Sequence, residues 1–308
     1  MARPLAPEEL QDWSQVLHLL VLDALMKESS WNHSFLVFHG GTSLHLSWRS
    51  PRFSEDLDFL LNRSAERSLD SVMKRTHRRV QDTLLARDPH LQVEMTSREG
   101  ARPQLKDYRF KLSREGVLGK ARVKVEFWMV SEAYLTTYAT TSRAPSGDTA
   151  LVGVLTAEPV PSATLESAYC DKLVAFATRP RVKWRDLFDL WWIRTNSRFD
   201  LPAPESLART FLDRLAAYQT VEGLSPSAAL RRFAGQMTED MVIQSERDLK
   251  PWLPEALWAK WYPDEVRVMV SEAREGALSI AGDLDRIVLD ADPAGRPPGE
   301  LDDAAPSP

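Results

Sequence analysis

The sequence predicts an α+β protein in which an N-terminal domain with a mixed β-sheet precedes a C-terminal α-helical domain. Segments with strand-like alternation all fall before residue 158, where helical segments are interspersed among them. A proline-containing stretch, Glu158–Pro161, then interrupts the pattern, and the segments that follow have helical periodicity. We therefore expect a sheet domain over 1–158, a helical domain over 159–289 and a disordered acidic tail over 290–308.

The elements of the N-terminal domain follow from periodicity and turn residues. Pro7–Glu28 has apolar residues near a 3.6-residue period and predicts an amphipathic helix. The apolar run Phe35–Phe38 ends at a Gly-Gly turn, and Thr42–Trp48 begins another helix. The rest of the domain is predicted to contain a charged helix over Ala65–Arg87 and strands over Asp56–Leu61, Leu91–Ser97, Leu105–Leu112 and Ala121–Val130.

The C-terminal domain is predicted to be helical. Ser162 is expected to cap its first helix, because a serine side chain can accept a hydrogen bond from a first-turn N–H group. The tail is rich in Pro, Gly, Ala and Asp, which cannot bury a core. The predicted helices are Ser162–Thr178, Trp184–Thr195, Pro204–Tyr218, Ser225–Glu239 and Pro263–Glu275.

Composition limits the class of protein. The 308 residues are 43% hydrophobic and 27% charged, a balance that excludes wholesale disorder. The single cysteine, Cys170, excludes an internal disulfide. No signal peptide is visible, and the apolar runs are far shorter than a membrane span. We expect a cytoplasmic protein that has no membrane partner.

The net charge of −5 hides an uneven distribution. Residues 283–308 contain seven acids and two bases and thus carry −5, so residues 1–282 sum to zero. Residues 98–124 contain nine bases and three acids. This stretch predicts a local basic face that could meet polyphosphate or RNA. The alternative is a solvated strand face without a ligand.

One pair of motifs indicates phosphate chemistry. Asp56 and Asp58 are two residues apart on a predicted strand, so both carboxylates lie on one face and favour a cation between them. Such a pair is the usual protein contribution to a Mg²⁺ site, which substrate phosphates and water complete. The Gly40-Gly41 turn leads into a helix whose free N–H groups suit a phosphate. Each motif alone is common, and their succession along the chain is far more specific.

The stretch that contains these motifs resembles a known family. Gly40-Gly41-Thr42-Ser43, followed by Arg52-Phe53-Ser54-Glu55-Asp56-Leu57-Asp58-Phe59, is similar to the first motif of polymerase-β-like nucleotidyltransferases, and in particular to the AbiEii/AbiGii toxin branch. Lys172 and the run Arg185-Asp186-Leu187-Phe188-Asp189 resemble later motifs of that branch. Two departures are a gap of fourteen residues between Gly41 and Asp56, and His39 where relatives often have lysine.

The resemblance implies a set of site residues and ligands. The superfamily has a third carboxylate on a neighbouring strand, for which Glu126 is the best candidate, Glu94 is a competitor, and pairing with Lys124 or Arg122 is the alternative. Asp189 either belongs to the NTP site or holds Arg185 or Lys172 in place. The implied ligands are an NTP and Mg²⁺, or Mn²⁺ in its place. The expected metal ligands are Asp56, Asp58 and Glu126; the expected NTP-binding residues are Gly40, Gly41, Thr42, Ser43, Lys172 and Asp189; and the expected catalytic residues add Asp186 and Ser54 to Asp56, Asp58, Lys172 and Glu126.

The resemblance also implies a biological role. The family suggests a toxin of a toxin–antitoxin or phage-defence system that transfers NMP from NTP to an acceptor, with a cognate antitoxin as partner. The basic stretch favours the 3′ end of tRNA as acceptor, and a protein acceptor is the alternative. Two other functions remain as alternatives. The same site could catalyse kinase-like phosphotransfer, or the chain could be an inactive module that binds a nucleotide or RNA.

Overall fold

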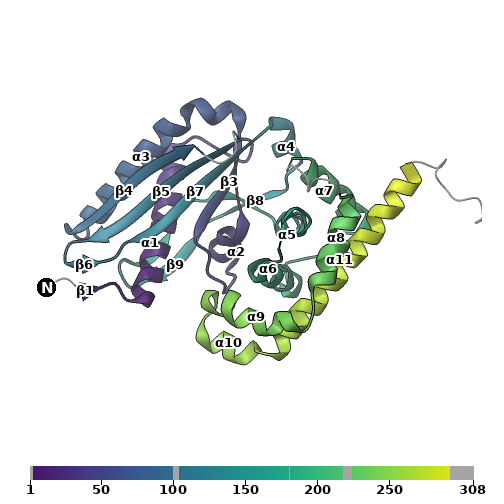
Figure 1. Cartoon of the computed structure of the whole chain (residues 1–308). Helices are drawn as coiled ribbons and strands as arrows, with labels where there is room; N and C mark the ends of the chain where they lie inside the picture. The colour runs from purple at the N-terminus through teal and green to yellow at the C-terminus, as the bar shows by residue number, and fades with distance from the viewer. Residues whose placement is uncertain (1–2, 100–103, 180, 218–223, 292–308) are drawn as a thin grey trace, which may run out of the picture.

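The computed structural model describes residues 3–99, 104–179, 181–217 and 224–291. A seven-stranded mixed sheet forms the N-terminal half, in the order β4-β5-β7-β3-β2-β11-β8 (Figure 1). Strand β3 pairs in parallel with β7 and antiparallel with β2, which places it near the middle of the sheet. The strands of this sheet are Leu36–His39 (β2), Asp56–Asn62 (β3), Leu91–Glu99 (β4), Leu105–Arg114 (β5), Ala121–Val130 (β7), Thr140–Arg143 (β8) and Val160–Ala163 (β11).

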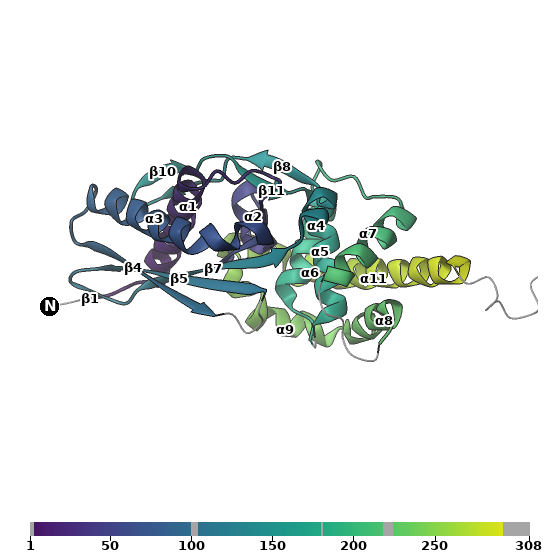
Figure 2. The same ribbon diagram turned by 90° about the horizontal axis from the view of Figure 1, so that it is seen from above.

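Two long helices cover one face of the sheet. Pro7–Glu28 (α1) and Glu66–Leu85 (α3) lie side by side against β4, β5 and β7, as Figure 2 shows from above. Their buried Val, Leu and Met side chains join Tyr108, Phe110, Val125 and Phe127 from the strands in one core. Burial on this scale is the main source of folding free energy. Smaller elements at the margins are Arg3–Pro4 (β1), Val117–Leu118 (β6), Glu132–Thr137 (α4), Ser146–Thr149 (β9), Gly153–Thr156 (β10) and the 3₁₀ turn Arg63–Ala65.

The C-terminal half is helical and has its own core. Its long last helix, Asp264–Ala291 (α11), packs along α7 and α8 (Figure 1). The other helices are Leu165–Thr178 (α5), Trp184–Thr195 (α6), Pro204–Ala217 (α7), Pro226–Gln236 (α8), Asp240–Asp248 (α9) and Glu255–Trp261 (α10), with a 3₁₀ turn at Lys250–Trp252. The predicted α+β class, a mixed sheet followed by helices, is confirmed. No helix in the described part of the chain is both long and apolar enough to span a membrane.

The short helix Gly40–Trp48 (α2) joins the two halves. Leu44 belongs to the helical core, whereas Leu46 belongs to the core of the sheet. The loop after α2 also reaches the helical half, because the N–H group of Phe53 donates to the carbonyl of Trp252 at 2.8 Å. The segment that carries the Gly-Gly motif is therefore held from both sides.

The structure corrects the expected connection between the halves. Residues Val160–Ala163 were expected to form a linker and the start of a helix, but they form β11, which pairs with both β2 and β8. Ser162 is therefore a buried strand residue, and the side chain of Thr164 caps α5 by accepting a hydrogen bond from the N–H group of Ser167. The strand forms despite Pro161 because its pairing with β2 is limited to Ser162 opposite Phe38, and a strand with few ladder bonds tolerates a proline.

The C-terminal end also differs from expectation. The last helix was expected to end at Glu275, but α11 continues to Ala291. Its added turns bury Ala277, Ile280, Ala281 and Leu284 against the helical core. This tertiary packing extends the helix although the helical periodicity of the sequence after Glu275 is weak. Residues 292–308 of the predicted acidic tail, Tyr218 and residues 100–103 of the basic stretch lie outside the described residues.

Candidate active site

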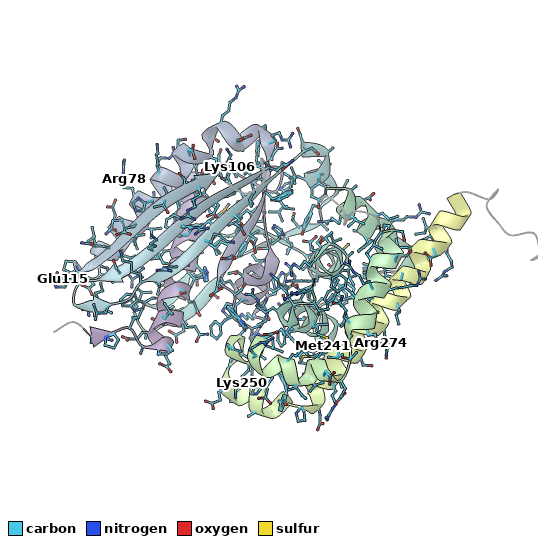
Figure 3. The ribbon with its side chains drawn as sticks, viewed as in Figure 1. Arg78, Lys106, Glu115, Met241, Lys250 and Arg274 are labelled. Carbon is cyan, nitrogen blue, oxygen red and sulfur yellow. The ribbon has the colours of Figure 1, made fainter. Side chains whose placement is uncertain are left out.

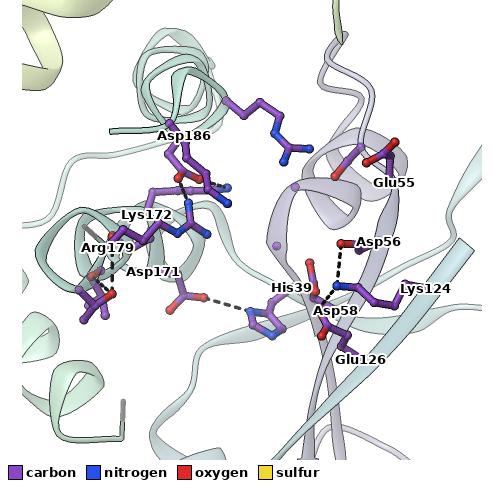
Figure 4. A pocket seen from close by; sticks show the side chains of 18 residues that line it. His39, Glu55, Asp56, Asp58, Lys124, Glu126, Asp171, Lys172, Arg179 and Asp186 are labelled. Carbon is purple, nitrogen blue, oxygen red and sulfur yellow. Dashed lines mark hydrogen bonds and ion pairs between the residues drawn. The ribbon is translucent and has the colours of Figure 1, made fainter. Parts of the chain in front are cut away.

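A cleft of about 460 Å³ lies where the sheet meets helices α5 and α6. Figure 4 shows carboxylates from β3 and β7 on one wall, and on the other wall Lys172 of α5, Arg179 at its end and Asp186 of α6. The Gly-Gly turn closes the cleft between these walls. The lining residues that belong to the predicted site are Gly40, Gly41, Ser54, Asp56, Asp58, Glu126, Lys172 and Asp186.

The two glycines are required by close contacts. Gly40 has a φ of +78°, and a Cβ atom there would lie 2.4 Å from Oδ2 of Asp58. A Cβ atom on Gly41 would lie 2.3 Å from an amino group of Arg52. His39, the N-cap of α2, makes no side-chain capping bond, so N–H groups of the first turn stay available for an anion.

Replacement of Gly40 tests this contact. Gly40→Ala is expected to lower kcat/KM about 100-fold, because the new methyl group must displace the carboxylate of Asp58. Gly116→Ala is the matched control, since Gly116 has a φ of +77° but nothing within 4 Å of the new Cβ atom. Both variants have the same backbone strain of about 1–2 kcal/mol, so equal losses of activity would refute the specific contact.

The acidic wall is built by strand pairing. Asp56 and Asp58 lie on the same face of β3, and the register places Asp58 opposite Glu126 on β7. Burial raises the pKa of Asp58 above its ordinary value, and the nearby charge of Asp56 adds to this effect. Burial and the charge of Asp58 likewise raise the pKa of Glu126. Three carboxylates crowded in this way favour a cation.

In this structure that cation is an ammonium group. Nζ of Lys124 lies 3.2 Å from Oδ2 of Asp56 and 2.9 Å from Oε2 of Glu126. Lys124, which was expected as an alternative partner of Glu126, thus pairs with both Glu126 and Asp56. Within the described residues no group of three His, Cys, Asp or Glu side chains has the arrangement of a preformed metal site. Mg²⁺ seldom needs one, because one or two carboxylates and substrate phosphates usually suffice.

The opposite wall is basic. Nζ of Lys172 on α5 lies 2.9 Å from Oδ1 of Asp186 and 2.6 Å from Oδ2 of Asp189. Arg179 at the end of α5 pairs with the other oxygen of Asp186. Lys183 lines the cleft nearby, and its pKa is lowered by burial and by the charge of Arg179. A wall with this surplus of cations suits a polyphosphate.

The structure separates Asp189 from the cleft. Asp189 is fully buried and accepts a bidentate hydrogen bond from Arg52, at 2.7 and 2.9 Å. Burial alone would raise the pKa of Asp189, but Arg52 and Lys172 hold it below its ordinary value. Of the two roles expected for this residue, the geometry favours holding Lys172 in place, although Arg52 and not Arg185 is the other partner.

The side chains of Thr42 and Ser43 are also buried and do not line the cleft. The Thr42 hydroxyl donates to the backbone carbonyl of Asp56, which fixes the start of β3 against α2. Any contact of these two residues with a ligand is therefore left to their backbone N–H groups. Ser54 lines the cleft beside Gly41, where a Cβ atom would lie 2.9 Å from its hydroxyl oxygen.

Sequence reasoning missed several lining residues. Nδ1 of His39 lies 3.6 Å from Oδ2 of Asp171 (Figure 4). Asp171 also pairs with Arg214 and accepts a hydrogen bond from Tyr138. Burial alone would raise the pKa of Asp171, but His39 and Arg214 hold it below its ordinary value. No local pattern predicts this group, because its members come from β2, α5, α7 and the end of α4.

A glycine turn at a helix N-terminus, paired carboxylates on the adjacent strand and facing cations together suit the transfer of a phosphoryl or nucleotidyl group from an NTP. The chain matches the family model described as "Nucleotidyl transferase AbiEii toxin, Type IV TA system" over residues 20–267. The protein belongs to this family of type IV toxin–antitoxin nucleotidyltransferases, and the expected resemblance is confirmed.

One solved structure supports the fold, and a second has a lower TM-score. JHP933 from Helicobacter pylori superposes with a TM-score of 0.50 and 16% sequence identity, covering 94% of this chain and 99% of that one. MenT4, a nucleotidyltransferase toxin from Mycobacterium tuberculosis H37Rv, gives a TM-score of 0.44 and 18% identity, covering 92% of this chain and 94% of that one. A comparison with curated protein sequences gives no match.

Proposed function

We propose that this toxin transfers NMP from an NTP to the 3′ end of tRNA in a Mg²⁺-dependent reaction. The observation that carries the proposal is the opposition of two charged walls across one cleft, with Asp56, Asp58 and Glu126 facing the cations of α5 and α6. Phosphoryl-type transfer depends on placement and charge stabilisation, and it needs no covalent bond to the protein. The helical half, proposed as a domain over 159–289, completes the site.

The triphosphate is assigned to the turn and the basic wall. Backbone N–H groups after Gly40 and Gly41 bind phosphate oxygens at the N-terminus of α2. Lys172, Arg179 and Lys183 stabilise the charge that develops on the leaving pyrophosphate. Asp186 and Asp189 keep the Lys172 ammonium group charged and oriented, although burial lowers its pKa. Ser54 orients the substrate beside the turn.

The metal is assigned to the acidic wall. Asp56 and Asp58 supply the two hard oxygen ligands that Mg²⁺ or Mn²⁺ prefers, and Glu126 adds a third carboxylate next to them. When bound, Mg²⁺ would neutralise the α-phosphate and the leaving group. Lys124 bridges Asp56 and Glu126, and its flexible side chain would have to leave these carboxylates for them to hold a metal.

The acceptor is assigned from the basic surface of the sheet and from the family to which the chain belongs. Basic residues of β5 and β7 lie on the face of the sheet that carries the catalytic carboxylates. Such a surface favours RNA, and blocking the acceptor end of tRNA would stop translation, as a toxin requires. A cognate antitoxin is the expected protein partner, because the family belongs to toxin–antitoxin systems.

Transfer of label tests the proposal. The protein is incubated with Mg²⁺, total tRNA and each α-³²P-labelled NTP, beside an Asp56→Ala/Asp58→Ala control. We expect label on tRNA with one or more NTPs and none in the control. Label on protein would replace tRNA with a protein acceptor. Label from γ-³²P but not from α-³²P NTP would indicate a phosphotransferase, and NTP binding without transfer would indicate an inactive binding module.

A further inference from the structure

One face of β4, β5 and β7 is open. Helices α1 and α3 lie on the other face, and Figures 1 and 2 show no described helix against these strands on the open side. The alternation of β7 buries Val123, Val125 and Phe127 under the helices, so the side chains between them point to the open face. Glu126 is one of these, so the open face is continuous with the acidic wall of the cleft.

Next to the catalytic carboxylates, the open face carries a basic block made of Arg109, Lys111, Arg122 and Lys124. The register places Arg109 opposite Lys124 and Lys111 opposite Arg122. Like charges directly opposite each other destabilise an antiparallel pair, so two such pairs in succession oppose folding. A surface shaped by stability alone would alternate the signs. This arrangement therefore indicates a polyanionic ligand.

The neighbours of the basic block leave two of its four residues without a direct ion pair. Asp107 pairs with Arg109 at 3.1 Å, and Lys124 is held by Asp56 and Glu126. Glu94 lies opposite Lys111 on β4, but its carboxylate binds Lys120 at 3.0 Å. Lys111 and Arg122 make no ion pair with any other described residue.

The basic block also lies on the side of the catalytic carboxylates from which the acceptor must approach. Residues two apart on a strand are separated by about 7 Å, so β7 extends about 13 Å from Glu126 to Arg122. Asp56 pairs with Lys124 and is the first residue of β3, so this part of β7 runs past the end of β3, away from the helical half. The triphosphate is assigned to the helical side. An in-line displacement needs the attacking hydroxyl on the side opposite the leaving group, which is the side of the basic block.

We propose that the basic block is the docking surface for the RNA acceptor, and that Lys111 and Arg122 bind phosphates a short distance before its reactive 3′ end. The inference rests on the proposed function and adds the path by which the acceptor reaches the site. Sequence discrimination is not expected from it, because phosphate contacts position the RNA without reading its bases.

The test compares two charge reversals of equal size. Lys111→Glu/Arg122→Glu changes the basic block, and Lys74→Glu/Arg78→Glu makes the same change on exposed positions of α3, on the helix-covered side of the sheet (Figure 3). Binding of a 5′-labelled tRNA transcript is measured by fluorescence anisotropy at several salt concentrations. The KM for NTP is measured alongside.

We expect the block variant to weaken tRNA binding about 10-fold or more and to reduce the slope of log K against log salt by about 1 to 2, with the KM for NTP unchanged. The α3 variant should bind tRNA within about 2-fold of wild type. If both variants bind tRNA with the same affinity and salt dependence while the wild-type protein still transfers label to tRNA, the docking surface is overturned and the proposed function is left intact. Wild type that neither binds nor labels tRNA would overturn both.

Discussion

Asp58→Asn is expected to lower the rate of nucleotidyl transfer at least about 1000-fold, equivalent to about 4 kcal/mol of transition-state stabilisation. Asparagine keeps the shape of the side chain but removes the charge that makes Asp58 a metal ligand. The neighbouring carboxylates of Asp56 and Glu126 remain and can still bind a cation, but neither places a charge at the position of Asp58, so the cation shifts away from the reacting phosphate. The measurement is kcat at saturating NTP and acceptor.

The same substitution should leave the fold as stable as wild type, or more stable. The pKa of Asp58 is raised in the folded protein, so above that pKa the folded state holds a carboxylate that would be more favourable in the unfolded chain. Asparagine removes this cost at neutral pH. Asp82→Asn, at an exposed position of α3, is the control and should change neither quantity. A clear fall in Tm for Asp58→Asn would show that Asp58 is a structural residue, and activity within 10-fold of wild type would exclude it as a metal ligand.

The acidic wall shows what the sequence predicts well. The two-residue period of a strand places Asp56 and Asp58 on one face whatever the rest of the fold. The flanking apolar residues of Glu126 mark its strand, and the parallel pairing of β3 with β7 then brings Glu126 beside Asp58. That pairing joins residues 68 positions apart in the chain, Asp58 and Glu126, so no local pattern determines it. The resemblance to a family supplied this step.

The basic wall shows what the sequence could not predict. The bounds of α6, Trp184–Thr195, follow from periodicity alone. The convergence of Arg179, Lys183 and Lys172 on the cleft depends on how α5 and α6 pack against the sheet, and packing is set by the whole core. The same holds for Asp171 and His39. A lysine or arginine at a helix end is usually solvated, so composition gave no reason to select Arg179 and Lys183, whereas Lys172 was expected from the family resemblance.

Arg52 is the largest omission, and its removal should have the largest effect on stability. Its side chain is 2% exposed and binds Asp189, which is 137 residues away on α6 and fully buried. Arg52→Met is expected to reduce the free energy of unfolding by about 3–5 kcal/mol, because among the described residues the substitution leaves the buried carboxylate with Lys172 as its remaining ion-pair partner. Chemical denaturation monitored by circular dichroism measures this change. Arg209→Met, which removes an exposed pair with Glu205, is the control and should cost less than about 1 kcal/mol.

The pH dependence distinguishes loss of this ion pair from simple loss of packing. The pKa of Asp189 is held low in the folded protein, so its contribution to stability is present above the unfolded pKa of about 4 and is lost as the pH falls through the folded value. The unfolded chains of wild type and Arg52→Met bind protons alike, so their stability difference should be constant near neutral pH and shrink as the pH falls from the folded pKa of Asp189 in the variant to the lower folded pKa in wild type. A difference that persists in acid would mean that Arg52 acts through packing.

Arg52→Met/Asp189→Leu should recover part of the loss of stability, since an apolar pair of similar volume can replace a buried ion pair while Lys172 still pairs with Asp186. If the double variant is no more stable than Arg52→Met, the contact between Arg52, in the loop after α2, and Asp189 on α6 stabilises the protein by its shape and not by its charge.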